Sequence, residues 1–168
     1  MEQLKIPKDR IPCLIGVKGK DKRNIEKITN TKITVDSKEG DIIIEGESLD
    51  CFLCKNIVKA ISRGFNPKIA LHLVNENYTL EIVNMDEFTK GSKNNLIRIR
   101  SRIIGTKGKA RKTIEQLTET DIIVYGKTVS IIGEQDKVYL AKRAVINLLQ
   151  GSEHSNVYSF IQRNKKDL

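Results

Sequence analysis

The chain has 168 residues, 39% of them apolar, so it is long enough to form one medium domain or two small ones with real cores. Lysine and arginine outnumber aspartate and glutamate by 30 to 21, and the net charge of +9 favours a polyanionic partner such as nucleic acid. Because there is no apolar run of about 18 residues, and residues 1–5 lack a signal-peptide core, we expect a soluble, cytoplasmic protein with no membrane partner.

The first part of the chain has the pattern of one small unit of strands and helices. The signals are proline near the start of a helix, apolar residues at helical spacing, and two β-branched runs on either side of a short loop. The expected elements are a strand at 4–6, helices at 7–15 and 21–29, a hairpin of strands at 32–35 and 41–45, and a helix from Ser48 to Gly64. We therefore expect a first domain over residues 1–65.

The second half repeats this order after a structured connection at 66–93, which is expected to hold a short helix at 67–74 and a strand at 78–83. The second domain is expected over residues 94–151. Its predicted elements are a strand at 95–100, a helix after 105–108, strands at 122–124 and 128–132, and an amphipathic helix at 134–149. Residues 152–168 predict a short helix beginning near Ser155 and a mobile basic tail over 163–168.

An internal repeat connects the two halves. Gly16 and Gly19 recur 89 positions later as Gly105 and Gly108, together with apolar, threonine and glutamate positions of the following segment. A single G-x-x-G is a weak signal, since such pairs occur in many turns. Two copies, each after an isoleucine and before a helix, predict a phosphate-binding turn, because glycine lets a phosphodiester approach the backbone and the helix supplies free N–H groups.

Positive charge gathers around the second pair of glycines. Residues 98–112 hold seven basic side chains and no acidic one, which favours nucleic-acid binding over an ordinary solvated surface. The predicted RNA-binding residues of this half are Arg100, Arg102, Ile104, Gly105, Thr106, Lys107, Gly108, Lys109, Arg111 and Lys112. Those of the first half are Ile15, Gly16, Val17, Lys18, Gly19 and Lys20.

The expected mechanism separates phosphates from bases. Loop N–H groups and lysines would hold phosphates, and bases would lie in an apolar groove formed by Ile103 or Ile104, Ile114 and the strand at 122–124. Aromatic residues make up only 5% of the chain, so aromatic stacking is not expected to dominate. In the first copy Asp21 takes the place of Ala110 and dilutes the positive charge, so a protein-binding face is the alternative there.

The order β-α-α-β-β-α, with G-x-x-G between the first two helices, resembles the type I KH domain. More closely, residues 102–115 and 124–133 resemble the second domain of the archaeal tandem-KH family of ribosomal RNA assembly and processing proteins, which is related to the eukaryotic partner-of-Nob family. Residues 6–11 and 157–160 are similar as well, so the resemblance covers nearly the whole chain. It implies an α+β fold of two type I KH domains in tandem, packed together.

The resemblance also implies a function. A KH domain clamps about four nucleotides of single-stranded RNA with its G-x-x-G loop. The family implies binding near the 3′ region of small-subunit rRNA during ribosome biogenesis, without cleavage. The implied protein partners are the α subunit of translation initiation factor two and the 3′-end processing endonuclease. The alternatives are a general tandem-KH regulator of assorted RNAs and a protein adaptor for a translation or RNA-processing complex.

Other patterns favour structural interpretations. Cys51 and Cys54 have metal or redox spacing, but they fall on a predicted helical face, so core packing is expected, and three cysteines without a disulfide framework fit a reducing compartment. The Gly126-Lys127-Thr128 run precedes a strand and is expected to be a β-turn, not a nucleotide-binding loop. His72 and His154 are expected on the surface, and we expect no enzyme, cofactor or metal site.

Overall fold

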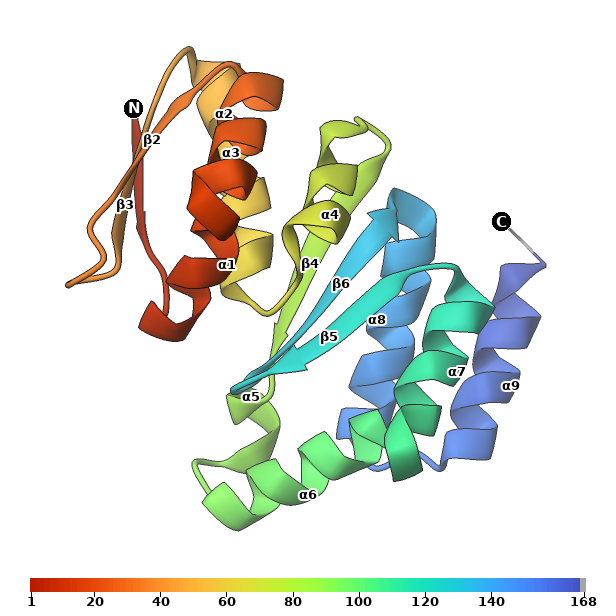
Figure 1. Ribbon diagram of the computed structural model, residues 1–168. Helices are drawn as coiled ribbons and strands as arrows, with labels where there is room; N and C mark the ends of the chain where they lie inside the picture. The colour runs from red at the N-terminus through yellow and green to blue at the C-terminus, as the bar shows by residue number, and fades with distance from the viewer. Residues whose placement is uncertain (167–168) are drawn as a thin grey trace. The chain divides into compact units, whose positions relative to one another are not determined.

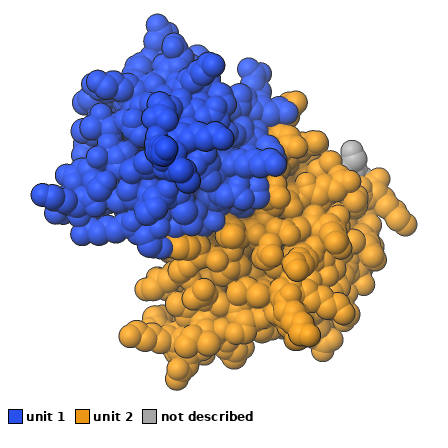
Figure 2. All heavy atoms as spheres, viewed as in Figure 1, with its two compact units in different colours: residues 1–76 blue, residues 77–168 orange. Residues whose placement is uncertain are grey.

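The structure is a computed structural model that describes residues 1–166. The chain divides into two compact units, residues 1–76 and residues 77–168, which are coloured separately in Figure 2. Each unit has a three-stranded sheet of its own (Figure 1). The α+β fold class is therefore confirmed. Within the described residues, no helix is both long enough and apolar enough to cross a membrane.

The first unit follows the expected order. Its elements are β1 (Glu2–Lys5), η1 (Lys8–Arg10), α1 (Ile11–Ile15), η2 (Val17–Gly19), α2 (Lys20–Thr29), β2 (Lys32–Val35), β3 (Asp41–Glu45), α3 (Ser48–Ser62), α4 (Pro67–Ala70) and η3 (Leu71–Val74). The strands are antiparallel in the order β1-β3-β2, with Ile44 opposite both Glu2 and Ile33. Alternation along β3 turns Ile42 and Ile44 into the core, where α3 covers them.

The third helix of this unit does not present the face that its spacing suggested. Leu49 and Phe52, two apolar residues of α3, are 83% and 61% exposed, and Ile28 on α2 is 44% exposed. The inward positions of α3 are held by these buried residues: Cys51, Cys54, Ile57, Val58, Ala60 and Ile61. The core-packing interpretation of Cys51 and Cys54 is therefore confirmed.

The second unit has the same order with two additions. Its elements are β4 (Tyr78–Asn84), α5 (Asp86–Thr89), α6 (Lys93–Ile104), η4 (Thr106–Gly108), α7 (Lys109–Thr118), β5 (Asp121–Tyr125), β6 (Thr128–Glu134), α8 (Gln135–Leu149) and α9 (His154–Lys165). The sheet order is β4-β6-β5, all antiparallel. The Gly126-Lys127 turn joins β5 to β6 as a hairpin, as expected. In Figure 1, α7 and α8 lie on one side of this sheet and α9 lies beside them.

The expected strand at 95–100 is wrong, because these residues belong to helix α6. The Ser92 side chain accepts a hydrogen bond from the Asn95 N–H and caps the helix, and Ile99 and Ile103, four residues apart, face the core. The strand position is filled by β4, which pairs with β6 from Tyr78 to Asn84. The strand assigned to the connection at 66–93 is thus the first strand of the second unit. Sequence alone misjudged this region because alternating Ile97 and Ile99 also fit a strand.

The C-terminal helix is longer than expected. It runs over His154–Lys165 and packs against α7 and α8, with Val157 and Ile161 buried. The tail predicted over 163–168 is therefore wrong for residues 163–165, which are helical. Residues 167 and 168 lie outside the described part of the chain.

Candidate nucleic-acid interface

The two G-x-x-G loops have the same backbone shape. In the second unit, φ is 74° at Gly105, 53° at Lys107 and 75° at Gly108. The equivalent φ angles in the first unit, at Gly16, Lys18 and Gly19, are 72°, 52° and 73°. A hydrogen bond of 3.2 Å closes each turn, from Gly108 N–H to the Gly105 carbonyl and from Gly19 N–H to the Gly16 carbonyl. The loops therefore have one conformation, built twice.

The two glycines of a loop are needed for different reasons. Gly105 has φ 74° and ψ 176°, a region that only glycine occupies readily, and an added Cβ would lie 2.6 Å from the Ala110 Cβ atom. Gly108 is in the left-handed helical region, and the nearest atom to an added Cβ is the Lys112 Cε atom at 3.9 Å. The first glycine thus lets α7 begin directly against the loop, and the second supplies only a positive φ.

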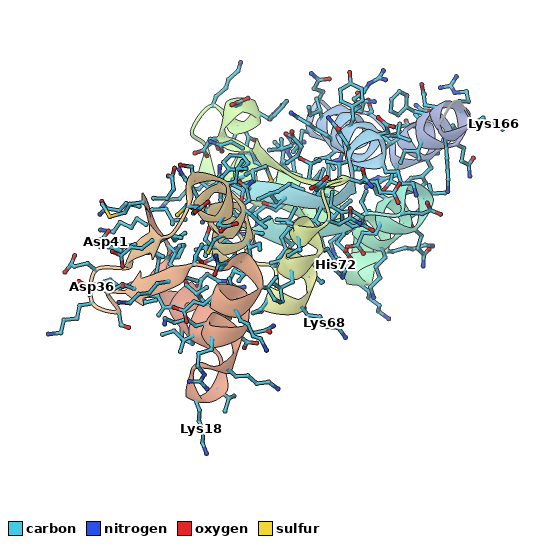
Figure 3. The ribbon with its side chains drawn as sticks, turned by 90° about the horizontal axis from the view of Figure 1, so that it is seen from above. Lys18, Asp36, Asp41, Lys68, His72 and Lys166 are labelled. Atoms are coloured by element: carbon cyan, nitrogen blue, oxygen red, sulfur yellow. The ribbon has the colours of Figure 1, made fainter. Side chains whose placement is uncertain are left out.

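Exposed cations surround the loop of the second unit. The exposed side chains here are those of Lys107, Lys109 and Lys112, together with the uncharged Thr106. The loop leads into the ten-residue helix α7, whose N-terminal end carries partial positive charge. In the first unit, Lys18 and Lys20 are exposed, and Figure 3 shows Lys18 extending away from the fold. Val17 is also 81% exposed. These side chains can reach a ligand without any rearrangement of the core.

Arg111 is held by its own unit. Its guanidinium donates to Glu115 Oε1 at 2.8 Å and to the Ile122 carbonyl at 3.1 Å, and Glu115 Oε1 also accepts from the Ile122 N–H at 2.8 Å. Glu26 repeats this pattern with the Lys22 ammonium and the Ile33 N–H. The repeated glutamate therefore fastens a helix to the first residues of the next strand.

Arg102 is also held. Its guanidinium donates to the Leu148 carbonyl at 3.0 Å and to the Ser152 carbonyl at 2.5 Å, at the end of α8. The Leu148 carbonyl lies in the last turn of α8 and also accepts from the Gly151 N–H at 3.1 Å, whereas Ser152 lies beyond the end of this helix. Arg102 thus joins α6 to the segment between α8 and α9.

Helix α6 presents different residues on its different sides. With 3.6 residues per turn, Ile97, Arg100 and Ile104 share one face, whereas Arg98 and Arg102 share the next. The predicted base groove needs a correction here: Ile103, Ile114 and Ile122 are 1%, 1% and 2% exposed and belong to the core, whereas Ile104 is partly accessible. In the first unit, a hollow of about 360 Å³ lies on the equivalent face and is lined by Lys8, Ile11, Pro12, Ile15, Gly16 and Ser37.

Comparison with known proteins identifies the fold. Residues 79–166 match the profile of the eukaryotic type KH-domain (KH-domain type I), and residues 1–60 match the profile of the KH domain. The chain belongs to the type I KH-domain family. The tandem-KH interpretation of the sequence is confirmed. The G-x-x-G turns lie between α1 and α2 in the first domain and between α6 and α7 in the second.

Relatives define the branch of this KH family. A KH domain-containing protein from Methanocaldococcus jannaschii is 42% identical over 173 aligned residues, covering 100% of this chain and 75% of that protein. RNA-binding protein PNO1 from Oryzias latipes is 31% identical over 64% of this chain. The match covers 44% of that protein, so this chain corresponds to less than half of the PNO1 relative.

Solved structures place the chain in the same family as the relatives found by sequence. Dim2p from Pyrococcus horikoshii is 44% identical with a TM-score of 0.90, over 96% of this chain and 98% of that one. A chain in the crystal structure of an a/eIF2alpha-aDim2p-rRNA complex from the same organism is 45% identical with a TM-score of 0.92, over 99% of this chain and 94% of that one. This chain is therefore a tandem-KH protein related to PNO1 and Dim2p.

The first KH domain carries an acidic residue at its loop. An added Cβ at Gly16 would lie 2.0 Å from the Asp21 Oδ2 atom, so the carboxylate occupies the place that the Ala110 methyl group has in the second domain. The two loops thus share their backbone but differ in charge. We expect the second loop to attract phosphate more strongly.

Sequence reasoning missed one feature of the second KH domain. Arg98, His154 and Tyr158 lie around a hollow beside the G-x-x-G loop. His154 is partly exposed, as expected of a surface residue, and its Nε2 atom lies 2.8 Å from the Arg102 carbonyl oxygen. Only Arg98 was signalled by the sequence, as part of the basic stretch, because the position of α9 depends on tertiary packing.

Proposed function

We propose that this protein binds single-stranded RNA in the 3′ region of small-subunit rRNA and acts in ribosome biogenesis in the cytoplasm without cleaving that RNA. One observation carries the proposal. A rigid Gly-Thr-Lys-Gly turn with positive φ at three of its four residues stands among exposed lysines at the start of a helix. The likeness to a chain in an a/eIF2alpha-aDim2p-rRNA complex supports rRNA as the ligand.

Phosphate binding would use the loop of the second domain. Gly108 leaves open space beside the loop backbone for a phosphodiester, and the helix dipole of α7 favours negative charge there. Lys107, Lys109 and Lys112 would add attraction screened by salt, since all three are exposed. Arg111 and Arg102, whose guanidinium groups are bound within the fold, would act by holding the loop's surroundings in place.

Base recognition would use the face of α6 that carries Ile97, Arg100 and Ile104. The equivalent face of the first domain is hollowed next to Ile15 and Gly16. Apolar walls can accept an unstacked base, and neighbouring main-chain groups can read its Watson–Crick edge. Ile15 and Ile104 would therefore contact bases, and Arg100 would contact either a base edge or the adjacent phosphate.

The loop is tested by a matched pair of double variants. Thr106→Asp with Lys107→Asp adds two acidic residues to the second loop, and Val17→Asp with Lys18→Asp adds them at the equivalent positions of the first. Fluorescence anisotropy would use a single-stranded RNA with the 3′-terminal sequence of small-subunit rRNA, and a scrambled RNA. We expect the second-loop variant to lose most of its binding and the first-loop variant to lose less. Unchanged affinity of the second-loop variant, with an intact circular dichroism spectrum, would exclude the loop.

The salt response gives an independent measure. If about three to five phosphates are neutralised, the logarithm of the binding constant should fall with the logarithm of salt concentration with a slope of about minus two to minus four. A flat response would contradict the phosphate mechanism. Incubation of the pure protein with precursor rRNA should leave the RNA intact, and crosslinking in cells should concentrate reads at the 3′ end of small-subunit rRNA, which a general regulator would not do.

A protein-adaptor role is a second candidate, because one structural relative lies in a complex that includes a/eIF2alpha. We propose the α subunit of translation initiation factor two as a partner, and a 3′-end processing endonuclease as another. A pull-down after ribonuclease treatment tests both. A direct protein contact should survive the treatment, whereas loss of the partner would mean that RNA bridges the two proteins.

A further inference from the structure

A second cationic hollow lies beside the G-x-x-G loop, on the α9 side of α6. Its volume is about 580 Å³, within the range of small-molecule sites, which is about 300–1,000 Å³. It is lined by Arg98, Ser101, Arg102, Gly105, Thr106, Lys109, Ala110, His154 and Tyr158. The β-α-α-β-β-α order ends with α8, so His154 and Tyr158 come from a helix that follows this order, within the stretch 79–166 that matches the KH profile.

The hollow and the loop share residues. Gly105, Thr106 and Lys109 line the hollow and also form the turn or the first residue of α7. The proposed base groove lies on the other face of α6, with Ile97, Arg100 and Ile104. An RNA strand whose phosphates rest on the loop can therefore reach the hollow with its next nucleotide.

The chemistry of the lining suits a nucleotide. Arg98 and Lys109 are exposed cations that can contact a phosphate, and Tyr158 and His154 present two rings whose centroids are 6.3 Å apart. Any of the four bases can stack on such rings, because each has an aromatic face. An acidic peptide would use the cations but not require the rings, so the observations favour RNA.

The hollow is held in shape before any ligand binds. The Arg102 guanidinium donates to the Leu148 and Ser152 carbonyls, and the Arg102 carbonyl accepts from His154 Nε2–H at 2.8 Å. Since a carbonyl oxygen only accepts, this bond places the proton on Nε2 and fixes the ring plane. One residue of α6 thus secures the start of α9, and a preformed site loses less free energy to ordering on binding.

We propose that this hollow binds one further nucleotide of the RNA strand, stacked against Tyr158 with its phosphate near Arg98. The inference rests on the proposed function, because the strand must first be bound at the loop. It extends the second KH domain by a nucleotide site that α9 completes. A protein with the same KH motif but without this helix would lack the site.

The test compares RNAs of different length on the full chain. A four-nucleotide RNA fills the loop, and the same RNA extended by one to three nucleotides at either end reaches the hollow on one side. In the unchanged protein, extension at one end should strengthen binding, and Tyr158→Leu should remove about 5- to 50-fold of that gain, in keeping with base–aromatic stacking. Binding of the four-nucleotide RNA should not change. Tyr158→Phe keeps the ring and should keep the gain.

Charge is tested by a matched pair. Arg98→Gln removes a cation at the hollow and should reduce the salt slope for the extended RNA by about 0.7. Arg163→Gln removes an exposed cation elsewhere on α9 and should leave the slope unchanged. Tyr158 packs against the core, so its replacement could destabilise the protein. Thermal melting of every variant shows whether the protein stays folded.

Three outcomes would overturn the proposal. The first is that Tyr158→Leu weakens the binding of short and extended RNAs equally. The others are that the affinity gained on extending the RNA is unchanged in a protein with both Tyr158→Leu and Arg98→Gln, or that it is lost in Tyr158→Phe. Failure of the proposed function would look different, since Thr106→Asp with Lys107→Asp would then bind RNA of every length normally. A 4-thiouridine at the extending position should crosslink to the peptide that contains Tyr158. A crosslink only to β6 or α8 would count against the site.

Discussion

The carboxylate of Asp21 lies against the backbone of Gly16, so close that a Cβ on this glycine would be 2.0 Å from the Asp21 Oδ2 atom. A negative charge therefore stands beside the first G-x-x-G loop and at the start of α2, where a phosphate would otherwise meet free N–H groups and the positive end of the helix dipole. The backbone of a phosphate site is present, but its electrostatics are changed.

We expect Asp21→Ala to raise RNA affinity through the first loop. The effect is best measured in a protein whose second loop carries Thr106→Asp and Lys107→Asp, so that the first loop accounts for the remaining binding. We expect the RNA affinity at low salt to rise by about 3- to 10-fold, which corresponds to about 1 kcal/mol of binding free energy, the size of a charge effect at a helix end. The reciprocal change, Ala110→Asp, should weaken the second loop. Glu47→Gln, an exposed acid elsewhere in the first unit, is the control, and an equal gain there would make the effect one of net charge.

The two glycines of the second loop should differ in their tolerance of substitution. Gly105→Ala places a methyl group 2.6 Å from the Ala110 Cβ atom in a glycine-only region, and we expect the free energy of unfolding to fall by about 2–4 kcal/mol. Gly108→Asn has space and a left-handed φ that asparagine adopts, so about 1 kcal/mol or less should be lost. Urea denaturation followed by circular dichroism measures both. Equal losses would contradict the geometry of the loop.

Arg111 should matter more for stability than for RNA binding. Its bonds to Glu115 and to the Ile122 carbonyl are partly shielded, and Arg111→Met should lower the free energy of unfolding by about 1–2 kcal/mol. The loss of RNA affinity should be smaller than for Lys107→Met, which removes an exposed cation without a structural role. The two variants lose the same charge, so a larger affinity loss in Arg111→Met would show that the guanidinium leaves Glu115 to bind RNA.

Arg10 and Arg102 should be equivalent in their effect on stability although they are not equivalent in the repeat. Arg10 donates to the Ile61 and Phe65 carbonyls at the end of α3, as Arg102 donates to carbonyls at the end of α8. Arg10→Met and Arg102→Met should each lower the free energy of unfolding by about 1.5–3 kcal/mol, because charged hydrogen bonds to partly buried carbonyls are lost. Denaturant unfolding measures this, and Arg163→Met is the exposed control. A loss no larger than the control's would show that neither bond stabilises the fold.

The three cysteines should react unequally with alkylating agents. Cys51 and Cys54 are 1% and 0% exposed, and burial raises the pKa of the Cys54 thiol, so less of the reactive thiolate forms at a given pH. Cys13 is partly accessible. Iodoacetamide at pH 8 should modify Cys13 first, and Cys51 and Cys54 only in denaturant, as peptide mass spectrometry would show. Rapid labelling of Cys54 in the folded protein would contradict its burial.

Much could be predicted from the sequence because its two halves are repeats that can be compared with each other. Gly16 recurs 89 positions later as Gly105, and this repetition indicated a functional turn. A single G-x-x-G could not have been distinguished from the many ordinary turns with the same spacing. In the structure, both turns have positive φ at their two glycines and at the lysine between them. The repeated glutamates and threonines had no assigned role, because their partners, such as the Ile33 and Ile122 N–H groups, are brought near only by folding.

The sequence by itself determined the tandem architecture and the positive charge around the second loop, since these depend on spacing and composition along the chain. Only the tertiary structure decided that residues 93–104 form a helix, because the strand position beside β6 was already taken by Tyr78–Asn84. It also decided which cations face solvent. Arg102 and Arg111 look like Lys107 in the sequence, but a guanidinium within reach of helix-end carbonyls or a carboxylate is bound by them, and the loop lysines are left for the phosphate.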